Sequence, residues 1–151
     1  MRGTRFSGFL LIEVVLVVFF SSLLCLLVIP TLCRLQRKMV LLSAAHQVAT
    51  VIRLARVEAI EGETQTRIIF DVAGNSVVFR GKENKSVRYK MPSGVFLYTT
   101  NFPSHELRFL PRGTPFCGGT VVLRTRSERK YIIVVPVTGR VRLSDTPPPP
   151  M

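Results

Sequence analysis

The sequence predicts an α+β fold, in which a long N-terminal helix, half transmembrane and half amphipathic, packs on an antiparallel β-sheet head. Three observations lead to this prediction. The chain carries an unbroken apolar run near its start, continues with apolar residues at helical spacing, and then changes to short β-type runs separated by Gly, Pro and Asn. With 151 residues, it has room for one head domain beyond the helix.

The apolar run occupies residues 9–29 and contains a single charged residue, Glu13. As a helix, these 21 residues measure about 32 Å, which is enough to cross the hydrocarbon core of a bilayer. A cleaved secretory signal is the rival interpretation, but such a signal has a shorter apolar region that ends in a small-x-small site. Because no such site ends this run, we expect a transmembrane helix over 9–30, with Pro30 kinking or locally melting it.

Helical spacing continues beyond Pro30. Apolar residues recur four and three positions apart and therefore share one face: Leu41, Ala45, Val48, Ile52, Ala55 and Ala59. We expect an amphipathic stalk helix over 31–62 that stops near Gly62. Its apolar face is expected to pack under the sheet of the head, and a helix lying on a membrane surface is the alternative.

The head is expected over 63–145, followed by a Pro-rich tail at 146–151. Eight runs of β-forming residues predict strands at 66–72, 76–80, 87–90, 95–100, 107–110, 120–125, 131–135 and 141–143. Ala73-Gly74-Asn75 is a natural hairpin turn between the first two. In the first strand, alternate residues from Ile68 are apolar, as in a strand with one buried side.

Composition restricts the possible functions. Only one of the three cysteines, Cys117, falls in the head, so an internal disulfide framework is excluded, and we expect this thiol to be inert or solvent-facing. The sequence contains no recognisable metal-ligand cluster, phosphate loop, nucleophile elbow or carboxylate pair, so we predict no enzymatic activity, no cofactor and no metal. The net charge of +12 favours an anionic partner: a lipid surface, nucleic acid or acidic neighbours in an assembly.

Glu13 needs an explanation, because a carboxylate at the centre of a membrane helix costs about 3 kcal/mol. A charged partner would lower this cost. Since Glu13 lies one turn into the apolar run, it could also reach the interface or stabilise the helix N-terminus. Basic residues flank the run on both sides, so the charge count leaves the orientation of the helix open.

The residues around Glu13 resemble the processing site of type IV pilins and pseudopilins. They combine a short basic leader at 1–8 ending in Gly8, then Phe9, an apolar stretch and a glutamate at the fifth place after the glycine, and Pro30 also matches a family position. The resemblance implies that a prepilin peptidase cuts after Gly8 and methylates the new amino terminus at Phe9.

It also implies a location and partners. The leader would be cytoplasmic and the head would lie outside the cytoplasmic (inner) membrane, which the chain crosses once. The amine of Phe9 in one subunit could pair with Glu13 of a neighbour, so that each charge relieves the desolvation of the other. The implied partners are other pilin or pseudopilin subunits, the peptidase and an assembly platform in the membrane. An ordinary single-pass anchored protein, with an accidental pilin-like string, is the alternative.

The C-terminal third resembles the branch of minor pilins and pseudopilins typified by the H pseudopilin of type II secretion and the FimT minor pilins. The shared pattern is F-x-P-x-G from Phe109, a Gly-Thr strand, and a strand closing in G-R-V-R at 139–142. The resemblance implies a subunit of a type IV pilus or of a type II secretion pseudopilus.

In FimT-like proteins of natural transformation, a G-R-x-R motif is implicated in DNA binding, and it corresponds here to Gly139, Arg140 and Arg142. Two arginines two apart on a strand would present their guanidinium groups to successive phosphates. The preceding hairpin could widen that patch with four more basic residues: Arg124, Arg126, Arg129 and Lys130. A competence-type pilin that binds extracellular DNA is therefore one interpretation, and arginines that hold the head or contact a neighbouring subunit are the other.

Overall fold

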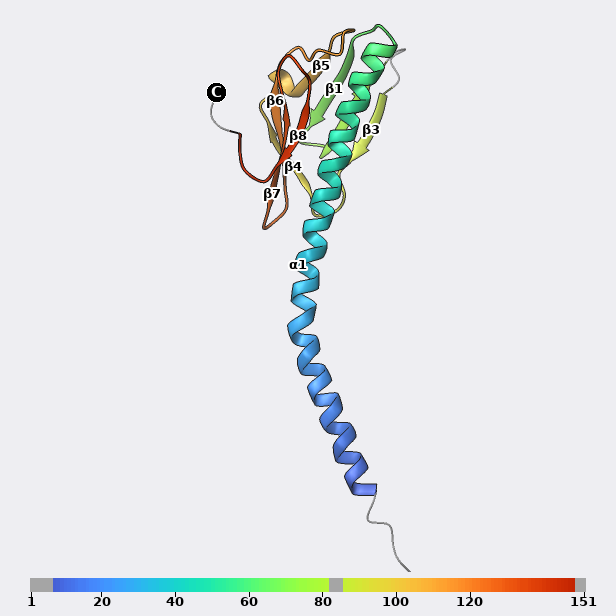
Figure 1. Ribbon diagram of the computed structural model, residues 1–151, viewed down its shortest axis with the longest axis vertical. Helices are drawn as coiled ribbons and strands as arrows, with labels where there is room; N and C mark the ends of the chain where they lie inside the picture. The colour runs from blue at the N-terminus through green and yellow to red at the C-terminus, as the bar shows by residue number, and fades with distance from the viewer. Residues whose placement is uncertain (1–6, 82–85, 149–151) are drawn as a thin grey trace, which may run out of the picture. The chain divides into compact units, whose positions relative to one another are not determined.

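A computed structural model describes residues 7–81 and 86–148. The chain divides into two compact units, Met1–Gln36 and Arg37–Met151. The first unit contains the apolar run, and the second, called the head unit below, contains the rest of the helix and all the strands. Figure 1 labels the helix and most of the strands, with the colour running from the N-terminus to the C-terminus.

The helix α1 spans Ser7–Glu61, and the last residue is one short of the predicted stop at Gly62. The amide of Gly62 still donates to the carbonyl of Glu58, at 2.9 Å. α1 continues through Pro30 without interruption, so the expected local melting is wrong. A proline removes one N–H donor and presses on the preceding turn, and a helix can absorb both by bending without unwinding.

Within the head unit, α1 buries the predicted apolar face. The six positions predicted from their spacing are at most 1% exposed: Leu41, Ala45, Val48, Ile52, Ala55 and Ala59. This burial confirms the packed interpretation of the stalk over the membrane-surface alternative. Several of these residues are alanines, whose small side chains let the helix lie close to the strands. The hydroxyl of Thr66 donates to the carbonyl of Ala55 at 2.8 Å and ties the first strand to the helix.

The eight predicted strands are all present, with ends that differ by one or two residues. They are β1 Thr66–Asp71, β2 Ser76–Arg80, β3 Ser86–Lys90, β4 Phe96–Thr100, β5 Glu106–Phe109, β6 Gly119–Arg124, β7 Arg129–Val134 and β8 Val141–Ser144. A short 3-10 helix, η2, at Pro103–His105 was not predicted. The expected β1–β2 hairpin is confirmed, and the carboxylate of Asp71 accepts the amide of Gly74 at its turn.

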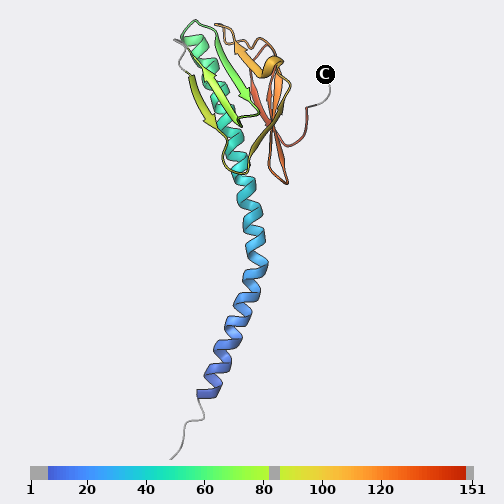
Figure 2. The ribbon, with the colours of Figure 1, turned by 180° about the vertical axis from the view of Figure 1, so that it is seen from behind.

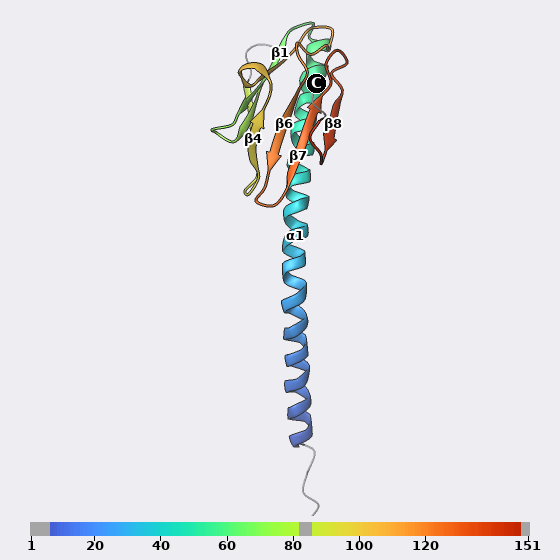
Figure 3. The ribbon, with the colours of Figure 1, turned by 90° about the vertical axis from the view of Figure 1, so that its left-hand side faces the viewer.

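The strands form two four-stranded antiparallel sheets, where the sequence had suggested one. Sheet A has the order β3-β2-β1-β5, and sheet B has the order β4-β6-β7-β8. Figure 2 shows sheet A beside the helix, and Figure 3 shows the strands of sheet B. The side chain of Asn75 joins the two sheets, because it donates to the carbonyl of Val95 and accepts the amide of Leu97 at the start of β4.

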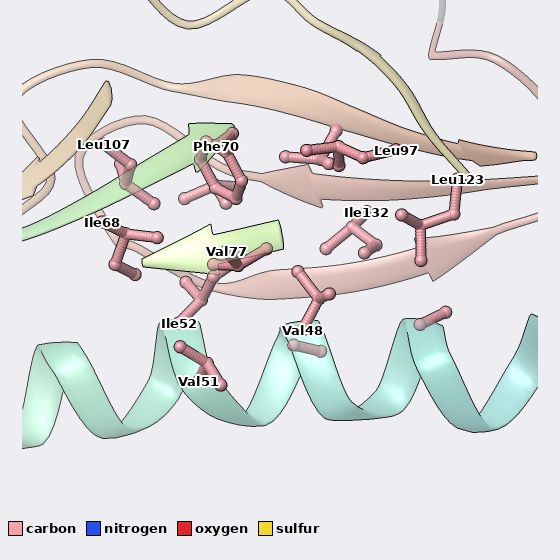
Figure 4. Close-up of a cluster of buried hydrophobic side chains, with 14 of the residues drawn as sticks. Val48, Val51, Ile52, Ile68, Phe70, Val77, Leu97, Leu107, Leu123 and Ile132 are labelled. Carbon is pink, nitrogen blue, oxygen red and sulfur yellow. The ribbon is translucent and has the colours of Figure 1, made fainter. Parts of the chain in front are cut away.

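One hydrophobic core fills the space between the helix and the inner faces of both sheets (Figure 4). Ile52 of α1 faces the strands that carry Ile68, Phe70 and Val77, and the side chains of sheet B, such as Ile132, complete the cluster. The ring of Phe70 stacks on that of Phe102, with centroids 5.5 Å apart. The second half of α1 is therefore part of the head core and fixes which faces of the sheets remain outside.

Candidate assembly helix and basic head surfaces

The predicted processing site lies at the start of α1. Gly8 and Phe9 are in its first turn, directly after Ser7, while the rest of the predicted leader lies outside the described residues. α1 is also, among the described residues, the one helix long and apolar enough to cross a membrane. These observations place the predicted site and the predicted span on one continuous helix.

The apolar side chains described in the first unit are exposed. Leu11 is 71% exposed, Phe19 is 63% exposed, and every side chain described between residues 10 and 36 is exposed. Glu13 is exposed among them, and no described residue forms a hydrogen bond or ion pair with its carboxylate. Among the described residues, this apolar surface is left uncovered.

Arg140 lines a groove of about 540 Å³ in the head unit, together with two arginines of α1. The groove is formed by Arg53, Arg56, Val57, Ile60, Gly139, Arg140 and Val141. Arg56 is held there because its Nε donates to the carbonyl of Gly113 at 3.1 Å. Three guanidinium groups over aliphatic side chains suit an anionic ligand that also carries apolar groups.

Arg142 lies on β8, between Val141 and Leu143, which both pack against the core. Arg142 is therefore on the outer face of sheet B, directly opposite Ile133 of β7. Its side chain is exposed.

Arg124 and Arg126 lie at the other end of sheet B. Arg124 pairs with Arg129 at the turn between β6 and β7. Arg140 lies at the opposite end of the sheet, where its carbonyl accepts the amide of Val135, just past the end of β7. Six residues of strand separate these two levels, or about 20 Å. The structure therefore does not bring the four predicted arginines into one patch.

Lys130, which follows Arg129, does not join the arginines at either end of sheet B. Its side chain is only 11% exposed, and its ammonium group pairs with the carboxylate of Asp145. The hydrogen bond from Lys130 lowers the pKa of Asp145, and the charge of Lys38 on α1 adds to the effect. The start of β7 therefore lies close to the part of α1 that carries Lys38.

The hairpin end of sheet B contains two aromatic residues that sequence reasoning missed. The guanidinium carbons of Arg124 and Arg129 lie 5.2 and 5.5 Å from the ring centroid of Tyr98, within cation–π range. Phe96 of β4 lies directly opposite Arg124 and is 56% exposed. A register shift between Leu97 and Thr99 interrupts the β4–β6 pairing at Tyr98. Because β4 is far from this hairpin in sequence, no local pattern could reveal the cluster.

The outer face of sheet A carries paired charges. The carboxylate of Glu106 bridges to Arg108 at 2.8 Å and to Arg67 at 3.8 Å, and the hydrogen bond from Arg108 is the main reason that the pKa of Glu106 is lowered. Arg88 similarly faces Asp71 at 3.8 Å. These ion pairs neutralise charges on the outer face of sheet A within the head, so this face offers less free charge to a ligand.

Cys117 is partly buried, and the described residues offer no metal site. Burial raises the pKa of its thiol, and the nearby charge of Arg108 offsets only part of that rise. The thiolate is therefore disfavoured at neutral pH, as expected for an inert cysteine. Among residues 7–81 and 86–148, no group of three or more His, Cys, Asp or Glu side chains could hold a metal ion.

A membrane-length helix whose second half forms the core of a β-sheet head defines the class of pilin-like subunits. The chain belongs to one family of that class: the family model described as type II transport protein GspH matches residues 44–139. This family comprises structural pseudopilins and minor pilins, which are anchored in the membrane by an N-terminal apolar helix. Comparison with curated proteins found no match.

Solved structures share the fold of this chain. The minor pseudopilin EpsH from the type 2 secretion system of Vibrio cholerae aligns with a TM-score of 0.57 and 16% identity, over 70% of this chain and 96% of EpsH. The type IV minor pilin FimU of Pseudomonas aeruginosa aligns with a TM-score of 0.56 and 16% identity, over 69% of this chain and 87% of FimU. A second crystal form of FimU gives a TM-score of 0.55 and 17% identity, over 69% and 92%.

Proposed function

We propose that this protein is a minor subunit of a type II secretion pseudopilus or type IV pilus, cleaved after Gly8 by a prepilin peptidase and methylated at Phe9. The observation that carries the proposal is the exposed first unit of α1. An apolar helix surface, with one carboxylate that has no partner among the described residues, suits a subunit that passes from lipid into contact with its neighbours. The protein is the substrate of the peptidase and performs no catalysis itself.

Glu13 has a defined role in this proposal. After cleavage, the new amino terminus at Phe9 is a cation, four residues before the Glu13 carboxylate. Within one helix the two groups are adjacent, and in a stack of helices the amine of one subunit can reach the carboxylate of the next. Such a pair offsets the desolvation of both charges in an apolar filament interior. An assembly platform in the membrane would extract the subunit, with its head outside the cytoplasm.

Mass spectrometry of the N-terminus, on protein isolated from its native membrane, tests the processing. We expect a mature chain that begins with methylated Phe9. Replacing Gly8 with leucine should leave the full-length chain starting at Met1, whereas Gly3→Leu in the leader serves as the matched control and should still be cleaved. An unprocessed chain in the unmodified protein would refute this part of the proposal.

Assembly is tested separately with Glu13→Gln. This variant should be cleaved and inserted normally but should be lost from sheared filaments and from complexes with neighbouring subunits, since the partner of the Phe9 amine is gone. Glu61→Gln, at the exposed end of α1, is the matched control and should assemble. Normal assembly of Glu13→Gln would exclude the charge pair.

A second candidate function is the binding of extracellular DNA by the head, and the positive charge of the head favours this function. Of the 21 Lys and Arg residues, 18 lie from Arg37 onward, against eight of the nine acidic residues. Arg140 and Arg142 are both exposed. Phosphate contacts by such a surface would give affinity that falls steeply with salt and depends little on DNA sequence.

Duplex DNA binding by the full chain in detergent micelles tests this function. Replacing both Arg140 and Arg142 with glutamate should weaken binding at least about tenfold and reduce the salt dependence by about two phosphate contacts. The control variant, with the exposed residues Arg80 and Arg112 outside the groove replaced by glutamate, changes the net charge equally. An equal loss of DNA binding in both variants would mean that net charge alone, and not a specific site, drives binding. If the unmodified protein does not bind DNA at low salt, the function is excluded.

A further inference from the structure

Basic and aromatic residues gather at the hairpin end of sheet B, where Arg124 is paired with Phe96 and Arg129 and lies over Tyr98. We call this group the hairpin-end surface, and it consists of Phe96, Tyr98, Arg124, Arg126 and Arg129. The two rings are 56% and 48% exposed, unusually open for aromatic residues of a small head. Arg126 and Arg129 are exposed as well, the former in the turn between β6 and β7.

The arrangement of Arg124 and Arg129 works against the stability of the head alone. Their Cα atoms are directly opposite each other on β6 and β7, and like charges in that position repel. Among the described residues, neither forms an ion pair; both lie instead against Tyr98. The ring's π-electrons relieve part of the repulsion, and the remaining positive field is directed outward. An external anion would complete this surface.

The hairpin-end surface lies at the end of the head where α1 enters, as Figures 1 and 3 show for the β6–β7 turn. The effect of Lys38 on Asp145, which bridges to Lys130 at the start of β7, agrees with that position. Lys38 follows Ile29, the end of the apolar run, by nine residues. Nine residues span at most about 30 Å in any conformation, so this end of the head is tethered close to the membrane.

We propose that the hairpin-end surface docks on anionic phospholipid headgroups while the subunit is still anchored in the membrane. Arginines attract anionic lipids, and aromatic side chains settle in the zone between headgroups and acyl chains, so this surface combines both requirements of interfacial binding. The proposal rests on the membrane anchoring in the proposed function. A nucleic acid fits less well, because the Tyr98 ring already carries two guanidinium groups and is no open platform for stacking a base.

The sequence contains no tryptophan, so Phe96→Trp places a single reporter in the surface with little change in chemistry. The full chain carrying this substitution is inserted into nanodiscs of phosphatidylcholine, with or without phosphatidylglycerol, and with lipids brominated near the headgroup. We expect a blue shift and bromine quenching of the fluorescence of the introduced tryptophan only when phosphatidylglycerol is present. Raising the salt concentration should reverse both effects.

Two triple variants in the Phe96→Trp background distinguish lipid binding by the hairpin-end surface from an effect of net charge alone. Replacing Arg124, Arg126 and Arg129 with glutamate should abolish quenching. Replacing the exposed residues Arg67, Arg80 and Arg112, which lie outside both the hairpin-end surface and the groove at Arg140, with glutamate changes the net charge equally and should leave quenching intact. Circular dichroism checks that each variant folds. If the first triple variant does not fold, Arg126→Glu alone, in the exposed turn, should still weaken quenching severalfold.

Each outcome decides the proposal. No quenching in phosphatidylglycerol nanodiscs, or an equal loss in both triple variants, would overturn it. A response of the tryptophan to a single-stranded oligonucleotide, without any response to lipid, would reassign the surface to nucleic acid. Failure of the membrane anchoring is distinguishable, since the chain would then not co-elute with nanodiscs at all, whereas failure of docking leaves a co-eluting chain without lipid-dependent quenching.

Discussion

The two halves of α1 are similar in apolar content but opposite in burial. In the first unit Leu11 is 71% exposed, whereas in the head unit Leu41 is fully buried. Apolar residues surround the helix in the first half, whereas in the second half the buried ones follow one face. The second half therefore packs against strands of the same chain. In the proposed function, the exposed first half contacts lipid and then other subunits, so one helix would serve folding at one end and assembly at the other.

The largest contrast should come from truncating an isoleucine in each half. Ile52→Ala removes a fully buried side chain from the core and should destabilise the head by about 2–5 kcal/mol. Ile29→Ala acts on a side chain that is 56% exposed and should leave head stability unchanged. Urea unfolding of the full chain in micelles, followed by near-UV circular dichroism, measures both. Equal effects would mean that the two halves are not energetically separate.

A smaller contrast concerns two hydroxyl groups that each donate to a backbone carbonyl. Thr66 donates to Ala55 within the core, and Ser22 donates to Phe19 on the exposed helix, at 2.8 and 2.7 Å. Thr66→Val should cost about 1 kcal/mol of head stability, because it removes a buried hydrogen bond at nearly constant volume. Ser22→Ala should cost the head nothing in the same unfolding assay. A neutral Thr66→Val would show that β1 is held to α1 by packing alone.

The smallest contrast is in pH dependence. The pKa of Glu106 is lowered in the folded head, chiefly by its hydrogen bond from Arg108, so its contribution to stability is present above the unfolded pKa and is lost as the pH falls through the folded value. Glu106→Gln should reduce stability at neutral pH by less than about 1 kcal/mol, because Arg108 is partly exposed.

Once the pH falls below the lowered pKa of Glu106 in the folded head, the Glu106→Gln variant and the unmodified protein should converge, since both then lack the carboxylate. Glu13→Gln is the matched change in the first unit and should leave the acid limb of the head's stability profile unaltered. Denaturation at a series of pH values measures these profiles. A constant difference between the unmodified protein and Glu106→Gln across the acid range would contradict the ion-pair origin of the effect.

Local patterns predicted the elements well, because each element satisfies its own periodicity. The spacing from Leu41 to Ala59 identified the buried helix face, and the alternation in 68–72 identified the inner side of β1. Gly and Asn in 73–75 gave the hairpin turn. In each case the residues that determine the element lie close together in sequence, so the element could be predicted without knowing the fold.

The division into two sheets could not be predicted in this way. Which strand pairs with which is decided by contacts between distant segments, such as Thr66 with Phe109 in sheet A and Phe96 with Arg124 in sheet B. For the same reason, the predicted basic patch was separated into a groove beside α1 at Arg140 and a hairpin end at Arg124, and Lys130 proved to be buried. The positions of Gly8, Phe9 and Glu13 at the helix start, by contrast, depend on sequence order alone.

The chain order of the two sheets bears on how the head folds. β4 belongs to sheet B but precedes β5, which completes sheet A, so the sheets interleave along the chain. No cut in the sequence can release one sheet intact without leaving an unpaired strand from the other. The head should therefore reach its native state in one cooperative step, which requires the whole chain through β8.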